Sequence, residues 1–468
     1  MINEPLLIKA NYRDPGVSHY RGNPFIEALP PLKATKEAFI KHIKNYPARP
    51  KAADRKKGEI LRILELANLN QIVHPLPEYS DLEIAISALI RESYYARNPI
   101  TTSDMQRRHA IAVGGKDGVP FPSNWKSSGK GFLITGLSGM GKTTYINASL
   151  LQYPQVIEHT QYKDFPLKCR QVVWLKVRIP SDGTLRGFCI HFFQEVDLAL
   201  GTNYRRQALS IGSMSAMTSL MRQVATAISL GVLFIDELQN LRMLQSGDSN
   251  AMLVFFGSLC EDLGTGIVMV GTPAVEELFT DSIRNIRKIC SAGSQTIERM
   301  KKDDLQWQLF CEVLWEYQWV KNKQPLTKEI MDVWYHFTQG ITAFAVLFFA
   351  LAQRRAIGNS EEININVMSL VAHQDMAFLQ PALTALASND PKRMESFDDL
   401  VFSREFKKLE KLIGKAAYIG RDRDDNDEFE EIAEPQTKSH TTQNTQVNPK
   451  SDSYISLKTD DPHKPNWK

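Results

Sequence analysis

The chain has 468 residues, of which 43% are hydrophobic and 23% charged, and its formal net charge is +3. This is the composition of an ordinary soluble globular protein with room for two or three domains, and the whole-chain charge indicates no particular partner. The five cysteines are scattered without a C-x-x-C pair, which excludes a zinc signature and suits a reducing cytoplasm.

No signal peptide or membrane span is expected. The N-terminus lacks a basic region leading into an apolar one. The longest uncharged apolar run, Ile341 to Ala352, is too short to cross a bilayer and is predicted to be a buried helix. We therefore expect a cytoplasmic protein with no membrane partner.

After an irregular, proline-punctuated start, the first part of the chain is predicted to be helical. Three amphipathic helices are expected, over Leu32–Tyr46, Lys57–Leu69 and Asp81–Tyr95. The third is expected to be capped by Ser80 or Asp81. The second has an apolar face whose residues recur at helical spacing, namely Ile60, Ile63, Leu64 and Ala67.

Two segments here are predicted to be loops. Basic residues gather between the first two helices, at Arg49, Lys51, Arg55, Lys56 and Lys57. A solvated loop is the favoured interpretation, and a nucleic-acid contact is the alternative. Residues 114–130 are rich in Gly, Ser, Pro and Lys and are predicted to link this part to the next domain.

A glycine-rich loop then follows a predicted apolar strand, Gly131–Thr135. Residues 136–143 read GLSGMGKT, which is the spacing G-x-x-x-x-G-K-[ST], and a helix is expected after it. In this pattern backbone N–H groups surround phosphates, Lys142 reaches the β- and γ-phosphates, and the Thr143 hydroxyl binds Mg²⁺. The predicted ATP-binding residues are Gly136, Ser138, Gly139, Met140, Gly141, Lys142, Thr143 and Thr144.

Strands and helices alternate from this loop onward. Further strands are predicted over Gln171–Ile179, Gly231–Asp236 and Gly266–Gly271. Helices are predicted over Thr143–Leu151, Leu185–Leu200, Ser213–Ser229 and Asn250–Leu263. Such alternation is typical of an α/β fold with a parallel sheet covered on both faces.

Two of these strands end in residues suited to ATP hydrolysis. The third predicted strand delivers Asp236 and Glu237 at its carboxyl end. There Asp236 would hold Mg²⁺ through water, and Glu237 would polarise the attacking water as general base. The fourth strand ends at Thr272, which is placed to sense the γ-phosphate. An acidic residue beside the Asp favours hydrolysis over nucleotide binding alone.

Three arginines follow the fourth strand, at Arg284, Arg287 and Arg299. Hydrolysis needs a cation to stabilise charge on the γ-phosphate, and a neighbouring subunit often supplies it. These three are candidates for that arginine finger. Each taken singly is also compatible with an ordinary surface arginine.

After Asp304 the chain is predicted to be wholly helical. The expected helices are Leu305–Trp319, Lys328–Thr338, Ile341–Ala356, Asn366–Met376 and Asp398–Leu412. Beyond Gly420 the sequence turns acidic and then polar, and it is predicted to be disordered. The predicted domains are an N-terminal extension with linker (1–120), an α/β core (121–304), a helical lid (305–415) and a tail (416–468).

The chain resembles the TnsC/TniB family of AAA+ ATPase transposition regulators, and most of all its longer TnsC-like branch. The likeness covers roughly Tyr12 to Gln353. The ATPase motifs GLSGMGKTT, LFIDELQNL and IVMVGTP are shared with many P-loop proteins. IERM is a further shared motif, and NPFIEALPPL and the QW–YQW region that includes LWEYQWVKNKQPLT are the parts more specific to this family.

The resemblance implies a prokaryotic ATPase that assembles on duplex DNA as a ring or helical filament of six or seven subunits per turn. It would relay a signal from a TnsD/TniQ-type target selector to a DDE transposase, which the C-terminal tail would contact. ATP hydrolysis would reset the assembly. IERM resembles the family's Glu-Arg-Phe, so Arg299 is the first choice for the arginine finger.

The family's DNA-contacting loops map onto two segments with residues that can grip phosphates without reading bases. The predicted DNA-binding residues are Gly183, Thr184, Arg186, Thr202, Arg205 and Arg206. An ordinary turn and a solvated helix end are the alternatives. The segment Gly340–Phe344 lacks the lid arginine of shorter relatives, which predicts slow turnover.

Two other functions remain open from the sequence. A replication initiator or clamp-loader-like ATPase would usually carry a winged-helix domain, and none is recognisable after the lid. A signalling NTPase would bind no DNA and would use its helical ends to contact proteins. Salt-sensitive, ATP-dependent DNA binding separates the second alternative from the transposition regulator.

Overall fold

The computed structural model describes residues 7–113, 122–123, 125–243, 246–279 and 289–388. The chain divides into two units, Met1–Gly420 and Arg421–Lys468, and all the described residues lie in the first. The predicted helix Asp398–Leu412 and the predicted disordered tail lie outside the described residues.

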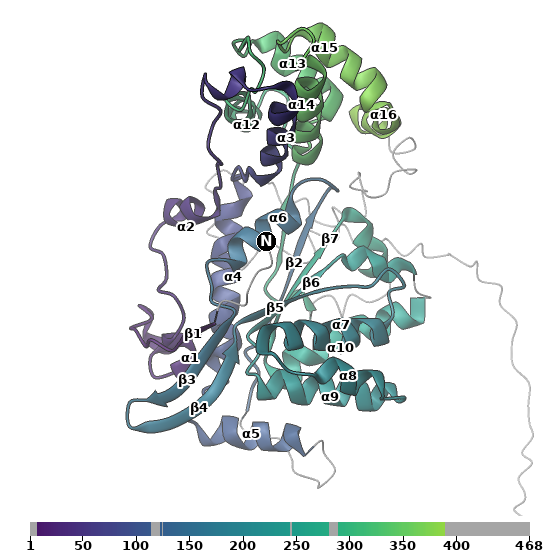
Figure 1. Cartoon of the computed structure of the whole chain (residues 1–468). Helices are drawn as coiled ribbons and strands as arrows, with labels where there is room; N and C mark the ends of the chain where they lie inside the picture. Colours follow the sequence, from purple (N-terminus) through teal and green to yellow (C-terminus); the bar gives the residue numbers. More distant parts are fainter. Residues whose placement is uncertain (1–6, 114–121, 124, 244–245, 280–288, 389–468) are drawn as a thin grey trace, which may run out of the picture. The chain divides into compact units, whose positions relative to one another are not determined.

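Within the described part of the chain, five parallel strands form a central sheet (Figure 1). In spatial order they are β5 (Trp174–Arg178), β6 (Val232–Asp236), β7 (Gly266–Gly271), β2 (Gly131–Gly136) and β8 (Ser294–Ile297). The predicted α/β fold with a parallel sheet is confirmed. β7 separates β2 from β6, so an additional strand stands between the two nucleotide-site strands. β8 has no counterpart among the predicted strands.

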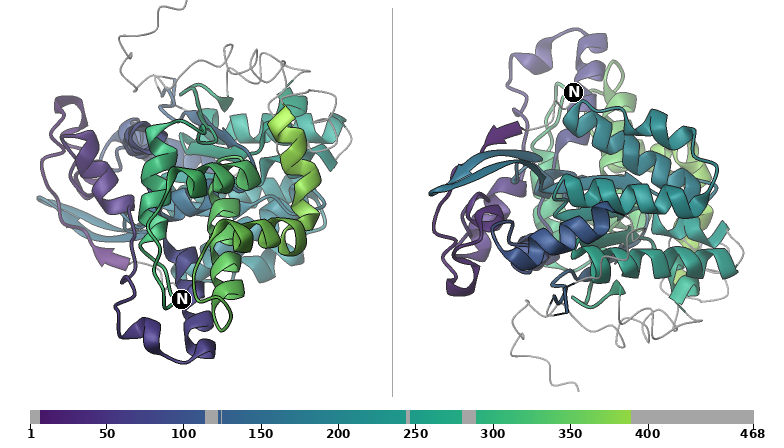
Figure 2. Two further views of the ribbon diagram at one scale, coloured as in Figure 1. Left: turned by 90° about the horizontal axis from the view of Figure 1, so that it is seen from above. Right: turned by 90° about the horizontal axis from the view of Figure 1, so that it is seen from below.

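Alternate residues of each central strand face opposite sides of the sheet, as the two-residue period of a strand requires. In β6, Val232 and Phe234 join one buried core, whereas Leu233 and Ile235 join the other. The first core includes residues of α4 (Glu78–Tyr95) and α6 (Lys142–Leu150). The second includes residues of α7 (Leu185–Leu200), α9 (Met214–Ala227) and α10 (Ser246–Leu263). Both views in Figure 2 show strands lying between helices.

A second, three-stranded sheet lies outside the predicted alternation. The hairpin β3 (Val156–Tyr162) and β4 (Phe165–Val172) is joined by β1 (Leu7–Lys9), which runs parallel to β3. The sequence predicts one strand over Gln171–Ile179, but the structure ends β4 at Val172 and begins β5 at Trp174. Most of the hairpin is only partly buried, so it lacks the apolar run that marks the central strands.

The N-terminal helices are α1 (Pro24–Glu27), α2 (Lys36–Ile43), α3 (Glu59–Glu65), α4 and α5 (Thr102–Ala112). α4 begins earlier than predicted, with Pro77 at its N-cap in place of Ser80 or Asp81. It contacts β6, β7 and β8 directly. The predicted N-terminal extension therefore supplies one of the layers that cover the central sheet.

The apolar face predicted for the second helix is wrong for α3. Ile60 and Leu64 are 74% and 66% exposed, whereas Arg62 is fully buried. The Arg62 guanidinium donates to both carboxylate oxygens of Glu361, at 2.7 and 2.8 Å, and to the carbonyl oxygen of Trp319. A bidentate, charge-assisted pair with its remaining donors satisfied outweighs the packing that the apolar spacing would have favoured.

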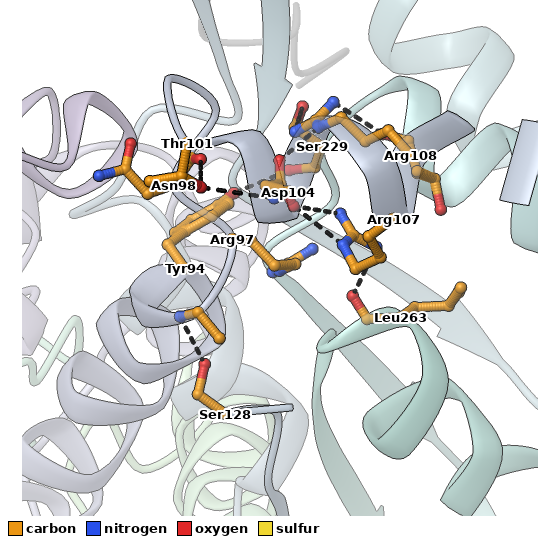
Figure 3. A network of polar contacts seen from close by, with 12 residues as sticks. Tyr94, Arg97, Asn98, Thr101, Asp104, Arg107, Arg108, Ser128, Ser229 and Leu263 are labelled. Carbon is orange, nitrogen blue, oxygen red and sulfur yellow. Dashed lines mark hydrogen bonds and ion pairs between the residues drawn. The ribbon is translucent and has the colours of Figure 1, made fainter. Parts of the chain in front are cut away.

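A buried ionic cluster fastens α5 to the central domain (Figure 3). Both Asp104 oxygens accept hydrogen bonds, one from Arg107 at 2.9 Å and one from Arg108 at 2.6 Å. Arg107 also donates to the carbonyl oxygen of Leu263, at the end of α10. Arg97 donates to the carbonyl oxygen of Leu230 at 2.7 Å. Two arginines thus bond to one carboxylate, and carbonyl groups supply acceptors for Arg107 and Arg97.

Asparagine in place of Asp104 should lower the free energy of unfolding by about 3–5 kcal/mol, because it leaves buried arginines without their counter-charge. The matched control is Asp262→Asn, which removes an exposed ion pair with Arg222 and should cost less than about 1 kcal/mol. Urea denaturation at neutral pH measures both. Equal stability of the two variants would show that the cluster does not hold the fold.

The same cluster predicts a direction for the pH dependence of stability. Burial alone would raise the pKa of Asp104, but Arg108 and Arg107 outweigh it and hold the pKa below its usual range. When the pKa of a carboxyl is lower in the folded than in the unfolded state, its ionised form stabilises the fold. This stabilisation is complete at pH values above the unfolded-state pKa of about 3.9, and it is lost as the pH falls through the folded-state pKa. In urea denaturation, the stability difference between wild type and Asp104→Asn should therefore shrink only in acid.

The last described part of the chain is helical, as predicted. Its helices are α12 (Leu305–Trp315), α13 (Lys328–Thr338), α14 (Thr342–Ala356), α15 (Ile365–Leu370), a π-helical turn (Val371–Asp375) and α16 (Gln380–Ser388). Trp334 packs between Trp307 and Phe349, with ring centroids 6.0 and 5.1 Å away. No single described helix is long and apolar enough to cross a membrane. Only α13 and α14 taken together reach that length and apolar content, and this pair is bent by 118°.

Candidate functional site

The glycine-rich loop connects β2 to α6 at the carboxyl end of the sheet. Gly139 and Gly141 have φ values of +83° and +79°, a region that residues with a Cβ atom rarely adopt. Gly141 is the N-cap of α6, so the helix begins at Lys142. The first-turn N–H groups of a helix have no intrahelical acceptors and favour an anion, which is the arrangement that phosphate binding requires.

Lys142 lies folded over this loop. Its ammonium group donates to the carbonyl oxygens of Gly136, at 2.7 Å, and Leu137, at 3.0 Å. The Met140 side chain is fully buried, so only the backbone of this residue can contact a ligand. Ser138 and Thr144 are exposed at the loop and the first turn of α6. The loop therefore presents one cation together with backbone N–H groups.

The predicted magnesium residues meet where the first turn of α6 approaches the carboxyl end of β6. The Thr143 hydroxyl donates to Asp236 Oδ2 at 3.1 Å, and Asp236 is 4% exposed. Hydroxyl and carboxylate oxygens are ligands that Mg²⁺ prefers, and it usually keeps several waters and phosphate oxygens besides. Within the described residues no three His, Cys, Asp or Glu side chains gather as a metal site.

Glu237 follows Asp236 with φ at +61°, a left-handed conformation that is unusual for a residue other than glycine. Its backbone N–H donates to Asp236 Oδ1 at 3.0 Å. Its Oε2 accepts a hydrogen bond from Gln239 Nε2 at 2.5 Å, and Gln239 Oε1 accepts one from the Thr272 backbone N–H at 3.2 Å. The structure therefore brings the predicted base and the predicted sensor together through Gln239, which is not among the predicted site residues.

The start of α14 contacts the glycine-rich loop. The carbonyl oxygen of Gly139 accepts hydrogen bonds from the Thr342 hydroxyl, at 2.8 Å, and from the Ala343 backbone N–H, at 2.9 Å. A Cβ atom at Gly139 would lie 3.0 Å from Ile341 Cγ2, so the glycine also permits this close approach. The start of α14, which offers no arginine to the site, is thus bonded to the loop through a hydroxyl and a backbone N–H.

The beginning of α4 adds a further wall that the sequence analysis does not include. A Cβ atom at Gly141 would lie 3.5 Å from the Tyr79 hydroxyl, and the Tyr79 and Tyr145 rings contact each other at a tilt, with centroids 4.3 Å apart. Burial raises the pKa of Tyr79, so this phenol stays neutral. Burial likewise raises the pKa of the neighbouring Glu78 carboxyl. A lone tyrosine in an N-terminal helix offers no sequence signal for this placement.

Of the three arginine-finger candidates, the structure describes one. Arg299 follows β8, and its guanidinium donates to the side-chain oxygen of Gln339 at 3.1 Å. Gln339 caps α13, so Arg299 connects the strand to the helical lid of its own chain. Arg284 and Arg287 lie outside the described residues. The identity of the finger stays a prediction.

The first predicted DNA-binding segment is an ordinary turn that opens α7. Gly183 has φ at +68°, and the Thr184 hydroxyl caps the helix by accepting from the Gly187 N–H at 3.2 Å. The Arg186 guanidinium donates to the carbonyl oxygen of Ile211 at 2.8 Å. The Thr184 and Arg186 side chains are thus already engaged within the fold.

The second predicted DNA-binding segment lies at the opposite end of α7. The Thr202 hydroxyl donates to Asp197 at 2.7 Å, whereas Arg205 and Arg206 are exposed on α8 (Tyr204–Leu209). α7 has 16 residues. At 1.5 Å per residue it is about 24 Å long, so the structure separates the two segments by roughly that distance.

Comparison with known proteins identifies the central domain. The family model described as an AAA domain matches residues 126–279. This match, together with the loop, the strand order and the paired carboxylates, shows that the chain contains a P-loop nucleotide-binding domain of the AAA class. No curated protein matches the chain.

The solved structures that are similar to this chain include the following two. The Walker-type ATPase PABY2304 of Pyrococcus abyssi is 11% identical, with 62% of this chain and 78% of that chain covered and a TM-score of 0.33. NtrX from Brucella abortus, solved in complex with ATP, is 14% identical, with 72% and 73% covered and a TM-score of 0.28. Because both TM-scores are low, the assignment of the AAA domain rests on the family match and on the geometry of the site.

Proposed function

We propose that this protein is an ATP-hydrolysing AAA+ switch that assembles on duplex DNA and regulates transposition. One observation carries the ATPase part: Thr143, in the first turn of α6, is bonded to Asp236 at the carboxyl end of β6, where Glu237 follows, beside the glycine-rich loop. The transposition part rests on the resemblance of NPFIEALPPL, IERM and LWEYQWVKNKQPLT to the TnsC-like regulators.

The chemistry proposed for the site needs a base, a sensor and cations. Hydrolysis joins a water oxygen to the γ-phosphorus and breaks the bond from that phosphorus to the bridging oxygen, while Glu237 takes the proton of the water. Thr143 and Asp236 would hold Mg²⁺, which neutralises phosphate charge when bound. Lys142 would donate to the phosphates, and a cation from a second copy, with Arg299 first in line, would stabilise the transition state.

On this proposal the ATP-bound form assembles as a ring or filament of six or seven copies per turn. A TnsD/TniQ-type selector would load it, and a DDE transposase would contact the tail, which lies outside the described residues. The lid contact supports coupling between nucleotide and assembly, because Thr342 and Ala343 are bonded to the phosphate loop itself. A nucleotide in that loop would therefore bear directly on the position of α14.

A second function, an NTPase switch without DNA, is favoured by one observation. Thr184, Arg186 and Thr202 are engaged in bonds within their own chain, so half of the predicted DNA contacts have other partners. Arg205 and Arg206 are the predicted contacts best placed to meet phosphates, because both side chains are exposed. The two functions differ in whether these arginines carry salt-dependent DNA binding.

We expect the ATP-bound protein to bind duplex DNA with little sequence preference and a strong dependence on salt. Replacing Arg205 and Arg206 by alanine should flatten the slope of log K against log salt by up to about two units, if each neutralises one phosphate. Fluorescence anisotropy with labelled duplexes and a slowly hydrolysed ATP analogue measures this.

The control removes the same charge from another surface, by replacing Lys301 and Lys302, both exposed, with alanine. A slope lowered only in the arginine variant supports the proposal. If both variants keep the wild-type slope, DNA contact lies elsewhere, and the basic segment from Arg49 to Lys57 is the next to test. If the wild type binds no DNA, the NTPase switch without DNA stands.

A further inference from the structure

Gln239 joins the ends of two strands in the nucleotide site. It lies on the 3-10 turn Leu238–Met243, directly after the strand that ends in Asp236. Its Nε2 donates to Glu237 Oε2 at 2.5 Å, and its Oε1 accepts from the Thr272 backbone N–H at 3.2 Å. One half-buried side chain therefore links the carboxyl end of β6 with that of β7.

The chemistry of the two partners allows one orientation of this amide. A carboxylate oxygen can only accept a hydrogen bond, and a backbone N–H can only donate one. The NH₂ group of Gln239 must therefore face Glu237, and its oxygen must face Thr272. A charged residue, an alcohol or an apolar side chain of similar length could not satisfy both partners at once.

The surrounding backbone keeps this link in place. Glu237 holds its left-handed conformation while its N–H is bonded to Asp236, so the direction of its side chain is restricted at the root. The next residue of the turn, Asn240, donates to the carbonyl oxygen of Ile179 at 3.0 Å. Gly271 leaves room for the bridge, since a Cβ atom there would lie 3.3 Å from Gln239 Oε1.

We propose that Gln239 is a positioning residue that aims the Glu237 carboxylate and fixes it relative to Thr272. This inference rests on the ATP hydrolysis proposed above. A glutamate carboxylate, set by three rotatable bonds, samples many directions, whereas a general base must lie within hydrogen-bond reach of its water. With Oε2 held by Gln239, the other oxygen, Oε1, is left to take the proton, at a set distance from the sensor strand.

Methionine in place of Gln239 keeps the length of the side chain and removes both hydrogen bonds. We expect kcat for ATP hydrolysis to fall by about 10- to 100-fold, the usual effect of misplacing a catalytic group by about 1 Å. KM and the affinity for a fluorescent ATP analogue should stay within about twofold, because Gln239 does not touch the loop residues that hold phosphates. The matched control is Gln308→Met, which removes an exposed Gln–Glu hydrogen bond on α12.

Two further variants separate positioning from mere packing. Gln239→Glu preserves the shape but sets a second carboxylate against Glu237, so its kcat should fall at least as far as that of Gln239→Met. In a Glu237→Gln background, Gln239→Met should cause almost no further loss, because the group on which it acts has gone. A packing defect would lower stability and kcat in that background as well.

The outcomes distinguish the inference from the function on which it rests. A wild-type protein that binds ATP and never hydrolyses it removes the proposed ATPase activity. An active wild type with unchanged or faster turnover in Gln239→Met leaves that activity standing and overturns the positioning role. A loss of kcat that is fully retained in the Glu237→Gln background also overturns it, because the effect would not pass through Glu237.

Discussion

Glutamine in place of Glu237 should slow ATP hydrolysis by about 10²–10⁴-fold, the usual contribution of a general base, and leave ATP binding intact. The substitution is nearly isosteric, and the oxygen of the new amide can still accept from Gln239. Phosphate release under saturating ATP measures turnover. Affinity for a fluorescent ATP analogue, measured in parallel, shows whether the loss lies in chemistry or in binding.

The assembled form should outlast that of the wild type, because slow hydrolysis delays the step that resets it. Sedimentation of the protein on duplex DNA, sampled over time after ATP is added, follows this. Glu312→Gln is a suitable control, since Glu312 lies exposed on α12 and bonds to Gln308. If Glu237→Gln turns ATP over at the wild-type rate, Glu237 is not the base, whatever its place at the end of β6.

Alanine in place of Lys142 should weaken nucleotide binding by about a hundredfold or more. Hydrogen bonds to charged groups contribute about 1.5–3 kcal/mol each, and this ammonium group supplies more than one. In the structure it already bonds to two carbonyl oxygens that line the loop, Gly136 and Leu137, so its position over the phosphate site is held by the fold. Ordered assembly on DNA should disappear with nucleotide binding.

Equilibrium titration with a fluorescent ATP analogue tests this, and Lys168→Ala, at an exposed position on β4, controls for the loss of one charge. Circular dichroism before and after thermal unfolding confirms that both variants are folded. Unchanged affinity in Lys142→Ala would remove the P-loop assignment and the functions built on it.

The candidate site divides into residues that a local pattern reveals and residues that it does not. Lys142 and Thr143 are recognisable because phosphate binding requires them at set positions after the glycines of one loop. Asp236 and Glu237 are recognisable because an apolar strand delivers them. Gln239 lies in the same stretch of sequence, but nothing local predicts its role, because its bond to Thr272 depends on β6 and β7 being neighbours in the sheet.

The contact between α14 and the glycine-rich loop is a second feature that the sequence does not reveal. The absence of an arginine near Gly340 predicts slow turnover, but it gives no sign that Thr342 is bonded to Gly139, 203 positions away in the chain. A hydroxyl and a backbone N–H are too common in sequences to mark such a contact. The contact becomes visible only when α14 is seen to begin against the loop.

By itself, the sequence determined the glycine-rich loop and the strand–helix alternation, and it predicted the magnesium residues and the base, because each depends on spacing within a few consecutive residues. Tertiary structure alone decided which side of α3 faces inward. The apolar spacing predicts that Ile60 and Leu64 face inward. In the structure Arg62 is buried instead, because it forms a bidentate pair with Glu361, 299 positions further along the chain. Periodicity in the sequence indicates that a helix has an apolar and a polar face. Which face is buried depends on side chains that are distant in the sequence and come close only in the folded chain.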